Sequence, residues 1–548
     1  MKKAILAALI VCLAYYGGKA QTYAILSSCS NNGNGLAWPC ASSSGAAGPF
    51  NAIPASQTRG ANYCMGPGTY SLGTTTVLST PDSGTSTITL LSPTSTNACS
   101  LVSGFNAIAD VGQAETGPLN FQTDYWTLSG EYRSTSTGNP WTDWFVEAGY
   151  GIKVDNQASY NSGTGVGVPV NATAAIIAGI PGTSPVGNIT VQYVDIQGSG
   201  DVSGSTSAKD DGFHTSWAEG CPTAPCANTL PQSIPGITLT KSYVHDLGLG
   251  GGFVCDSCTG AAVTYNGFDR AEVTPNNHSE MISFRCWQSG SNVTGNDANE
   301  TIAYNIVWDD NATADIATPC QTDIHPSTWD IYGNFFGVNG SRMNMLYTCP
   351  SSPTGNQLEC GVGDGFLSLW NFTTWGGYLH VFNNTIYAID DYQGLGIGFG
   401  TQGRCLHDWG GANPTSMGTV LFLNNIWIGC IGGIQLPTSC PATGSCTQYT
   451  DDYNSFFDIT GTVTAPGSNN QTSGTNPAVN LGQTAGAYNF SLASDTSTWS
   501  NTSSILSANN TDMLGHTRTT SRGALQFEPA LGPSSSVQGA SVSGATIH

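Results

Sequence analysis

The sequence predicts an all-β protein, a right-handed parallel β-helix wound as a single solenoid with long loops and a polar C-terminal segment. Three observations support this fold class. A short pattern of β-forming residues recurs along the chain, and asparagine returns at one place in the pattern. In addition, no stretch keeps the apolar period of roughly 3.6 residues that indicates a helix.

The recurring pattern is a run of β-forming residues with asparagine or a small residue near its centre. The copies are 189–196, 237–244, 301–308, 329–336, 379–386 and 420–427, with a frayed copy at 452–457. Aligning them places Asn305, Asn334, Asn384, Asn425 and Asn454 at one position. In a solenoid each coil repeats the previous one about 4.8 Å higher, so we expect these side chains to stack and hydrogen-bond. Asparagine also tolerates the left-handed backbone that a bend requires.

A second type of strand lies between these copies and begins with an acidic or small residue. Examples are 211–213, 280–282 and 364–366, with less acidic versions at 396–397 and 433–434. Side chains alternate along a strand, which predicts that the apolar residue of each copy faces the core. The residues expected inside are Phe213, Ile282, Phe366, Ile397 and Ile434, and those expected outside are His214, Ser283, Leu367, Gly398 and Gln435.

The N-terminus has the features of a secretory signal peptide at residues 1–20. Lys2 and Lys3 precede an apolar run from 4 to 16, and small residues before Gln21 suit cleavage near Ala20. A short membrane anchor is the alternative, but the run is too short to span a bilayer and no later stretch is apolar enough. We therefore expect a secreted protein, extracellular or at the cell surface, with no membrane span.

The mature chain divides into three segments on this interpretation. Residues 21–130 form the opening coils and cap, 131–460 the β-helix body, and 461–548 a C-terminal segment of lower apolar content. The pattern copies are widely spaced, so long loops must leave the coils. We expect the solenoid to be a monomer.

The cysteines indicate an oxidising compartment. Of 17 cysteines, one (Cys12) lies in the expected signal peptide, which leaves an even number and favours disulfides. Close spacing predicts that Cys255 bonds to Cys258 and that Cys440 bonds to Cys446. The alternative interpretation of 255–258 as half of a zinc site lacks a second pair with that spacing.

Charged residues are scarce and mostly acidic. The chain has 14 Lys and Arg against 36 Asp and Glu, a formal net charge of −22. An acidic surface repels nucleic acid and anionic membranes, so neither is an expected partner. A polyanionic glycan would also be repelled unless a cation such as Ca²⁺ bridges it. With 39% hydrophobic and 10% aromatic residues, the composition is not that of a disordered chain.

Several short motifs resemble those of a known group of proteins. The segment 63–70 ends in Pro67-Gly-Thr-Tyr70, and the strand-like segments 87–91 and 126–130 follow it. This order resembles the start of secreted right-handed β-helix proteins related to pectate-lyase-like polysaccharide enzymes. The tail, 511–515 with Arg518 and 523–528, is similar to their terminal segment but departs from its usual ending. The resemblance implies an architecture and not a chemistry.

A hydrolase interpretation uses the acids of the second strand type. By the stacking argument Asp211 and Glu280 lie two coils apart, roughly 10 Å. That is near the upper end of the spacing at which two carboxylates flank a glycosidic bond with a water between them. His214 and Arg285 would project from the same sheet and bind or polarise a sugar. The alternative is that acids before glycine only make the turn.

A lyase interpretation uses basic residues instead. β-Elimination from a uronate needs a base and a cation that neutralises the carboxylate. Candidates for the basic role are Lys241, Lys209, Arg285 and His278, and candidates for holding Ca²⁺ are Asp210, Asp211 and Asp246. Lys241 can equally be an ordinary solvated lysine at a bend.

Two classes of function remain open on the sequence. In the first, the protein acts on or binds extracellular polysaccharide as a lyase, a hydrolase or a binder. Trp217 and Trp287 would stack on sugar rings there and His245 would contact the substrate, although core packing is the ordinary role of tryptophan. In the second, the protein is a non-catalytic surface or matrix protein with a structural or adhesive role.

Overall fold

The structure is a computed structural model that describes much of the chain. The described residues are 20–131, 140–161, 166–169, 174–179, 186–198, 211–215, 234–247, 250–256, 258–271, 280–285, 288–289, 292–293, 299–308, 314–318, 328–337, 367–369, 378–387, 406–408, 419–430, 434–435, 448–459, 463–464, 467–472, 511–518 and 522–524. Most of their strands belong to three long parallel sheets, which we call sheet 1, sheet 2 and sheet 3, with 12, 11 and 9 strands.

The strands of each sheet come from successive coils of the chain. Sheet 1 contains β1 (Thr22–Ile25), β2 (Asn62–Met65), β5 (Ile88–Leu91), β8 (Trp126–Ser129), β13 (Ile189–Gln192), β17 (Ile237–Thr240), β21 (Ala262–Thr264), β26 (Glu300–Ala303), β29 (Thr328–Tyr332), β32 (Tyr378–Phe382), β35 (Thr419–Leu423) and β38 (Gln448–Asp452). Sheet 2 contains β3 (Gly68–Tyr70), β6 (Ala114–Thr116), β9 (Ile152–Asp155), β14 (Val194–Gln197), β18 (Tyr243–Leu247), β22 (Gly267–Ala271), β27 (Ile306–Trp308), β30 (Phe335–Gly337), β33 (Thr385–Tyr387), β36 (Ile426–Ile428) and β39 (Ser455–Phe457). Sheet 3 contains β4 (Thr76–Leu78), β7 (Leu119–Phe121), β12 (Ala174–Ala178), β15 (Asp211–Thr215), β19 (Phe253–Asp256), β23 (Glu280–Arg285), β28 (Ala314–Thr318), β31 (Leu367–Leu369) and β34 (Leu406–Asp408).

The other described elements are short. Four pairs of strands stand apart, namely β10 (Gln157–Asn161) with β11 (Val166–Pro169), β16 (Ile234–Pro235) with β20 (Cys258–Thr259), β24 (Gln288–Ser289) with β25 (Asn292–Val293), and β37 (Ile434–Gln435) with β40 (Val463–Thr464). The helical turns are η1 (Ala98–Leu101), α2 (Pro140–Asp143) and η2 (Glu147–Gly149). No helix in the described part of the chain has the length and hydropathy of a membrane span.

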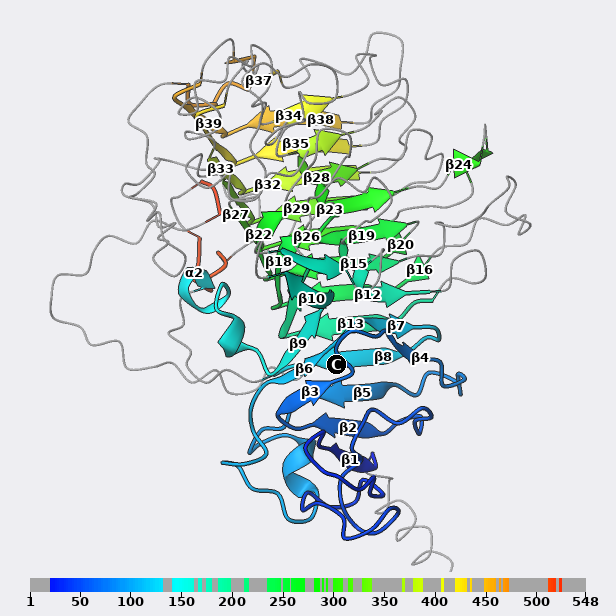
Figure 1. Ribbon diagram of the computed structural model, residues 1–548. Coiled ribbons are helices and arrows are strands. Elements are labelled where there is room, and N and C mark those ends of the chain that lie inside the picture. The colour runs from blue at the N-terminus through cyan, green and yellow to red at the C-terminus, as the bar shows by residue number, and fades with distance from the viewer. Residues whose placement is uncertain are drawn as a thin grey trace, which may run out of the picture.

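From β2 to β34 the chain visits sheets 1, 2 and 3 in the same order in each coil. For example, β13, β14 and β15 lie in sheets 1, 2 and 3, and each pairs in parallel with β17, β18 or β19 of the next coil. The coils stack along one axis, as the labelled strands in Figure 1 show. The predicted right-handed parallel β-helix is confirmed. The segments 87–91 and 126–130 also form neighbouring strands, β5 and β8 of sheet 1.

The interior is filled by apolar side chains that repeat from coil to coil. In sheet 3, Phe213 pairs with Phe253, which pairs with Ile282, and all three are fully buried. The rings of Phe213 and Phe253 meet edge to face with centroids 5.6 Å apart. Burial of such columns supplies the main free energy that holds the coils together.

The predicted asparagine column is confirmed. The side-chain amide of each of Asn305, Asn334, Asn384 and Asn425 donates to Oδ1 of the next asparagine, and Asn454 receives the last of these bonds, at 3.0 to 3.1 Å. All five side chains are fully buried at the turn between sheets 1 and 2. The column is longer than predicted, because Asn266 joins it at one end and Asn470 at the other.

The left-handed backbone at this turn belongs to the residue before each stacked asparagine. Tyr304 has φ of 58°, Gly333 of 68° and Asn383 of 51°. The expectation that asparagine tolerates this conformation therefore holds for Asn383, the residue before stacked Asn384. It does not apply to the stacked asparagines themselves. The stacked residue contributes its amide, which bonds to the neighbouring coils.

The predicted facing of the second strand type is correct at some positions and wrong at others. Phe213 and Ile282 face the core, and the register continues from Ile282 through Ile316 to Leu367. The prediction put Phe366 there, so it is out by one residue. Ile434 lies in β37, outside sheet 3. Phe366, Ile397 and Gly398 lie outside the described residues.

Disulfides connect cysteines in the described part of the chain. Cys255 is bonded to Cys258, as predicted, and this removes both thiols from the zinc alternative. Two further bonds join the pairs Cys29–Cys40 and Cys64–Cys99. The predicted pair Cys440–Cys446 lies outside the described residues. Residues 1–19 do as well, so the signal peptide stays a prediction.

The C-terminal segment returns to the coils. The backbone N–H of Gly523 donates to the carbonyl of Asn424 at 2.8 Å, and Nη1 of Arg522 donates to the carbonyl of Asn454 at 2.8 Å. Residues 511–518 and 522–524 therefore cover the turn that carries the asparagine column. The three-segment division of the chain stays a prediction.

Candidate functional site

The residues selected from the sequence separate onto two sheets. Asp211, His214 and Glu280 lie in β15 and β23 of sheet 3. His245 and Asp246 lie in β18 of sheet 2. The structure therefore offers two candidate sites, which we call the sheet-3 group and the sheet-2 cluster.

Other predicted site residues cannot be placed. Asp210, Trp217, His278 and Trp287, which were expected to hold a metal, contact sugar or act as a base, lie outside the described residues. For Arg285 only the backbone is described, and it pairs with Asp256 of β19. The roles expected of these residues stay predictions.

Asp211 and Glu280 hold equivalent positions in sheet 3. Each stands two residues before a member of the column Phe213, Phe253 and Ile282, whose pairing fixes the register of β15, β19 and β23. The coil of β19 therefore lies between the two acids, as the stacking argument predicts. Two coil steps separate them by roughly 10 Å.

Asp211 and His214 form an ion pair. Oδ2 of Asp211 lies 2.7 Å from Nδ1 of His214. The other oxygen, Oδ1, accepts a hydrogen bond of 2.6 Å from the backbone N–H of Gly251 in the next coil. This carboxylate therefore binds the backbone where β15 begins, as the turn interpretation expects. It also orients the ring of His214.

The sheet-3 group is buried, whereas the sequence predicts an exposed face. The exposed fractions are 1% for Asp211, 0% for His214 and 8% for Glu280. The contact of 2.7 Å with His214, which follows inward-facing Phe213, shows that the side chain of Asp211 at the start of β15 does not obey strict alternation. The group is therefore a desolvated set of two acids and a histidine.

Lys241 lies apart from the sheet-3 group. It occupies the bend between β17 and β18 with φ of 51°, at the turn from sheet 1 to sheet 2. Its Nζ donates to the hydroxyl of Tyr193 at 2.9 Å and lies 5.1 Å from the centre of that ring. These contacts match the interpretation of Lys241 as an exposed bend lysine.

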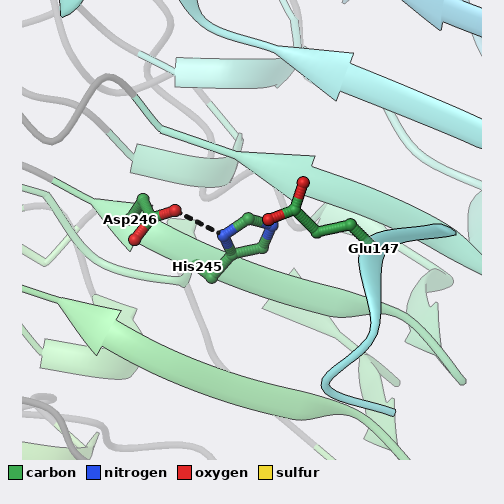
Figure 2. Close-up of side chains that lie close together, drawn as sticks. All are labelled: Glu147, His245 and Asp246. Atoms are coloured by element: carbon green, nitrogen blue, oxygen red, sulfur yellow. Dashed lines mark hydrogen bonds and ion pairs between the residues drawn. The ribbon is translucent and has the colours of Figure 1, made fainter. Parts of the chain in front are cut away.

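The sheet-2 cluster is built around His245, which is fully buried. Nε2 of the ring lies 2.7 Å from Oδ1 of Asp195, and Nδ1 lies 2.8 Å from Oδ2 of Asp246. Figure 2 shows Glu147 reaching the same ring from a separate segment. One ligand atom from each of Glu147, His245 and Asp246 lies within 4.8 Å of the other two.

Residues 144–150 cover this part of sheet 2. Glu147 of η2 forms an ion pair with Lys153 of β9 at 3.1 Å. Phe145 packs edge-on against Tyr243, whose ring stacks on His245 with centroids 4.1 Å apart. The cover buries the imidazole but leaves the side chain of Glu147 45% exposed.

Opposite charges in the cluster shift the pKa values of His245 and Glu147 toward the ionised forms. Burial alone would lower the pKa of His245, but the carboxylates of Asp195 and Asp246 outweigh it and raise this pKa from 6.5 to about 9. For Glu147, burial opposes ionisation, but the positive charges of His245 and Lys153 prevail and lower its pKa. The imidazole is therefore cationic at neutral pH, between carboxylates.

Sequence reasoning selected His245 and Asp246 but missed Glu147, Asp195 and Lys153. Asp195 lies within the repeat copy 189–196, one residue before inward-facing Ile196, so its outward direction was readable. Its contact with His245 follows from the stacking of β14 on β18. Glu147 gave no such signal, because its place depends on how residues 144–150 fold back over the sheet.

Comparisons with known proteins assign neither a family nor an activity to the chain. No protein-family profile and no curated protein matches the sequence. The structure is similar to the crystal structure of pectate lyase Pel9A, with 13% identity and a TM-score of 0.39, over 94% of this chain and 92% of that one. It is also similar to the Agl-KA catalytic domain, with 12% identity and a TM-score of 0.32, over 75% of this chain and 62% of that one. These values assign no activity to the chain.

Proposed function

We propose that this protein cleaves an extracellular polysaccharide by acid–base chemistry, with Asp211, His214 and Glu280 as the proton-transferring residues. The observation that carries the proposal is the buried ion pair of Asp211 and His214 at 2.7 Å. In its charged form such a pair loses several kcal/mol of hydration per ion, on the order of what the attraction between the two groups returns. A buried pair of this kind is therefore weak evidence for a stabilising role and a reason to look for a functional one.

The geometry of the pair suits proton transfer. A carboxylate on Nδ1 fixes the ring orientation and stabilises the imidazolium, which makes Nε2 the nitrogen that exchanges a proton. Glu280 supplies a second carboxyl group on the same sheet. Its separation from Asp211, roughly 10 Å by coil spacing, is close to the range of about 6.5–9.5 Å for two carboxyl groups that flank a glycosidic bond and a water. β-Elimination from a uronate would use the same proton transfer.

The shape and charge of the protein favour a polymeric, neutral substrate. The stacked coils extend along one axis (Figure 1), so an extended chain can contact several coils at once. The formal net charge of −22 disfavours a polyanion.

An activity screen tests the proposal. The purified protein is incubated with a panel of neutral and acidic polysaccharides, and both reducing ends and unsaturated products are measured. We expect turnover of at least one substrate, and we expect His214→Gln to lower it at least about 100-fold, because general acid–base catalysis contributes that much or more. The matched control is Asp330→Asn, which breaks a similar pair on sheet 1, where Asp330 lies 2.7 Å from His380. This control should retain turnover within about threefold.

The contrary results are equally clear. A folded protein that is inert on every substrate, or a His214→Gln variant with wild-type turnover, would contradict the proposal. The better account would then be the non-catalytic surface or matrix protein with a structural or adhesive role.

A further inference from the structure

The sheet-2 cluster contains a buried oxygen that its hydrogen bonds do not satisfy. Asp195 is fully buried, and its Oδ1 is bonded to Nε2 of His245. In the described part of the chain, its Oδ2 has no hydrogen-bond partner. Burying a carboxylate whose second oxygen lacks a hydrogen bond is costly, so the negative charge of Asp195 favours cations in its surroundings, of which Lys153 is one.

The charges of the cluster leave room for a dication. Glu147, Asp195 and Asp246 carry three negative charges, and Lys153 carries one positive charge. With a neutral imidazole, two negative charges remain. A doubly charged cation offsets more of this negative charge, to which buried Asp269 beside His245 in the next coil adds, than the single proton now on His245.

The ligand atoms also match one class of metal. Glu147, His245 and Asp246 offer one imidazole nitrogen and two carboxylate oxygens within 4.8 Å of one another (Figure 2). Mixed nitrogen and oxygen ligands suit Zn²⁺ and related transition metals, whereas Ca²⁺ prefers oxygen ligands alone. Bonds of about 2.0–2.2 Å from Zn²⁺ to its ligands require the three ligand atoms to lie somewhat closer to one another than 4.8 Å. Side-chain rotation can supply this closure of about 1 Å.

Asp195 would complete such a site without touching the metal. Metal-bound histidines usually donate the N–H of their other ring nitrogen to a carboxylate, which fixes the ring and raises its basicity. Here Asp246 already lies at Nδ1 and Asp195 at Nε2. The side chains of Glu147 and Asp246 are 45% and 25% exposed, so an ion can reach them from solvent.

We propose that Glu147, His245 and Asp246 form a binding site for a transition-metal dication of the Zn²⁺ type, oriented by Asp195. The ion takes the place of the proton on Nδ1 of His245, and that proton leaves to the solvent. The site lies on sheet 2 and does not depend on the activity proposed for the sheet-3 group.

Metal binding to the full-length, untagged protein tests the proposal. After treatment with EDTA and its removal, the protein is titrated with Zn²⁺, Mn²⁺ or Ca²⁺, and bound metal per chain is measured by elemental analysis and calorimetry. We expect Zn²⁺ to bind more tightly than Ca²⁺. Glu147→Gln and Asp246→Asn should each weaken Zn²⁺ binding at least about tenfold, the usual effect of losing a group that supports a metal. Asp330→Asn, in the Asp330–His380 pair for which the described residues offer no third ligand, should leave it unchanged.

Three results would overturn the proposal. They are no stoichiometric Zn²⁺ binding, tighter binding of Ca²⁺ than of Zn²⁺, and Zn²⁺ binding that neither variant weakens. Because Glu147 is half exposed, Glu147→Gln should fold, and its melting temperature without metal checks this. Zn²⁺ should raise the melting temperature of the wild type but not that of Glu147→Gln.

Discussion

The side-chain amide of Asn305 donates to Oδ1 of Asn334 at 3.0 Å, and this bond joins two consecutive coils inside the molecule. Asn334 in turn donates to Oδ1 of Asn384 at 3.0 Å and to the carbonyl of Ile302 at 2.9 Å. Each stacked amide therefore satisfies polar groups in the coils on both sides of it. The column is a continuous chain of buried hydrogen bonds.

Asn334→Ala should destabilise the protein strongly. The change removes both acceptor and donor, and it leaves the amide of Asn305 and the carbonyl of Ile302 buried without that partner. Each such group costs about 1–3 kcal/mol, so we expect a loss of several kcal/mol in the free energy of unfolding. Denaturant unfolding followed by circular dichroism measures it.

Asn62→Ala is the matched control for this prediction. Asn62 points outward from sheet 1, where its amide lies 3.4 Å from the hydroxyl of Thr22. Its loss should change the free energy of unfolding by less than about 0.5 kcal/mol. Equal effects of the two substitutions would show that the column contributes no special stability.

The fold could be predicted because its signal repeats. Asn305 and its equivalents mark the same turn in each coil, and their spacing revealed the solenoid before any strand was placed. The second strand type carries no such marker, so the register was placed one residue early at Phe366, whereas Leu367 is the residue that aligns with Ile316 and Ile282. When two apolar residues are adjacent, the sequence alone does not show which of them faces inward.

The stability of the protein should fall as pH rises from neutral to alkaline values. His245 has a pKa of about 9 in the folded state and 6.5 as its ordinary value, because Asp195 and Asp246 hold the imidazolium despite burial. A group with a raised pKa contributes its full stabilisation below pH 6.5 and loses it as pH rises through about 9. Melting temperatures in EDTA should therefore decrease across this window.

His245→Gln isolates this effect. The variant should be less stable than the wild type at pH 6, and its melting temperature should change less between pH 6.5 and 9. A wild-type melting temperature that stays level across the window, or a variant that follows the wild-type slope, would contradict the assigned protonation of His245.

The disulfide between Cys64 and Cys99 should stabilise the first coils. It closes a loop with a sequence separation of 35 residues, for which loss of the crosslink costs about 3–4 kcal/mol in the chain-entropy account. The double variant Cys64→Ala, Cys99→Ala should therefore melt several degrees lower. Peptide mapping without reductant should recover the crosslinked peptides, and free thiols at both positions would contradict the pairing.

The candidate sites were only partly predictable, for a physical reason. Asp211 and Glu280 each precede an apolar residue in equivalent strands, so their alignment across coils follows from the repeat itself. The contact of Glu147 with His245 joins a coil to a segment that folds back over it, and no periodic pattern reports such a contact. The burial of His214 was also missed, because alternation gives the side of a strand but not what covers that side.

The most direct test of the central claim is the turnover of Asp211→Asn and Glu280→Gln on whichever polysaccharide the screen reveals. Both variants are compared with the wild type at a temperature where melting curves show all three folded. If the sheet-3 group transfers protons, each substitution should lower turnover at least about 100-fold. If both variants stay within about threefold of the wild type, less than about 1 kcal/mol in activation free energy, these carboxylates only shape the strand entries and the proposed function is wrong.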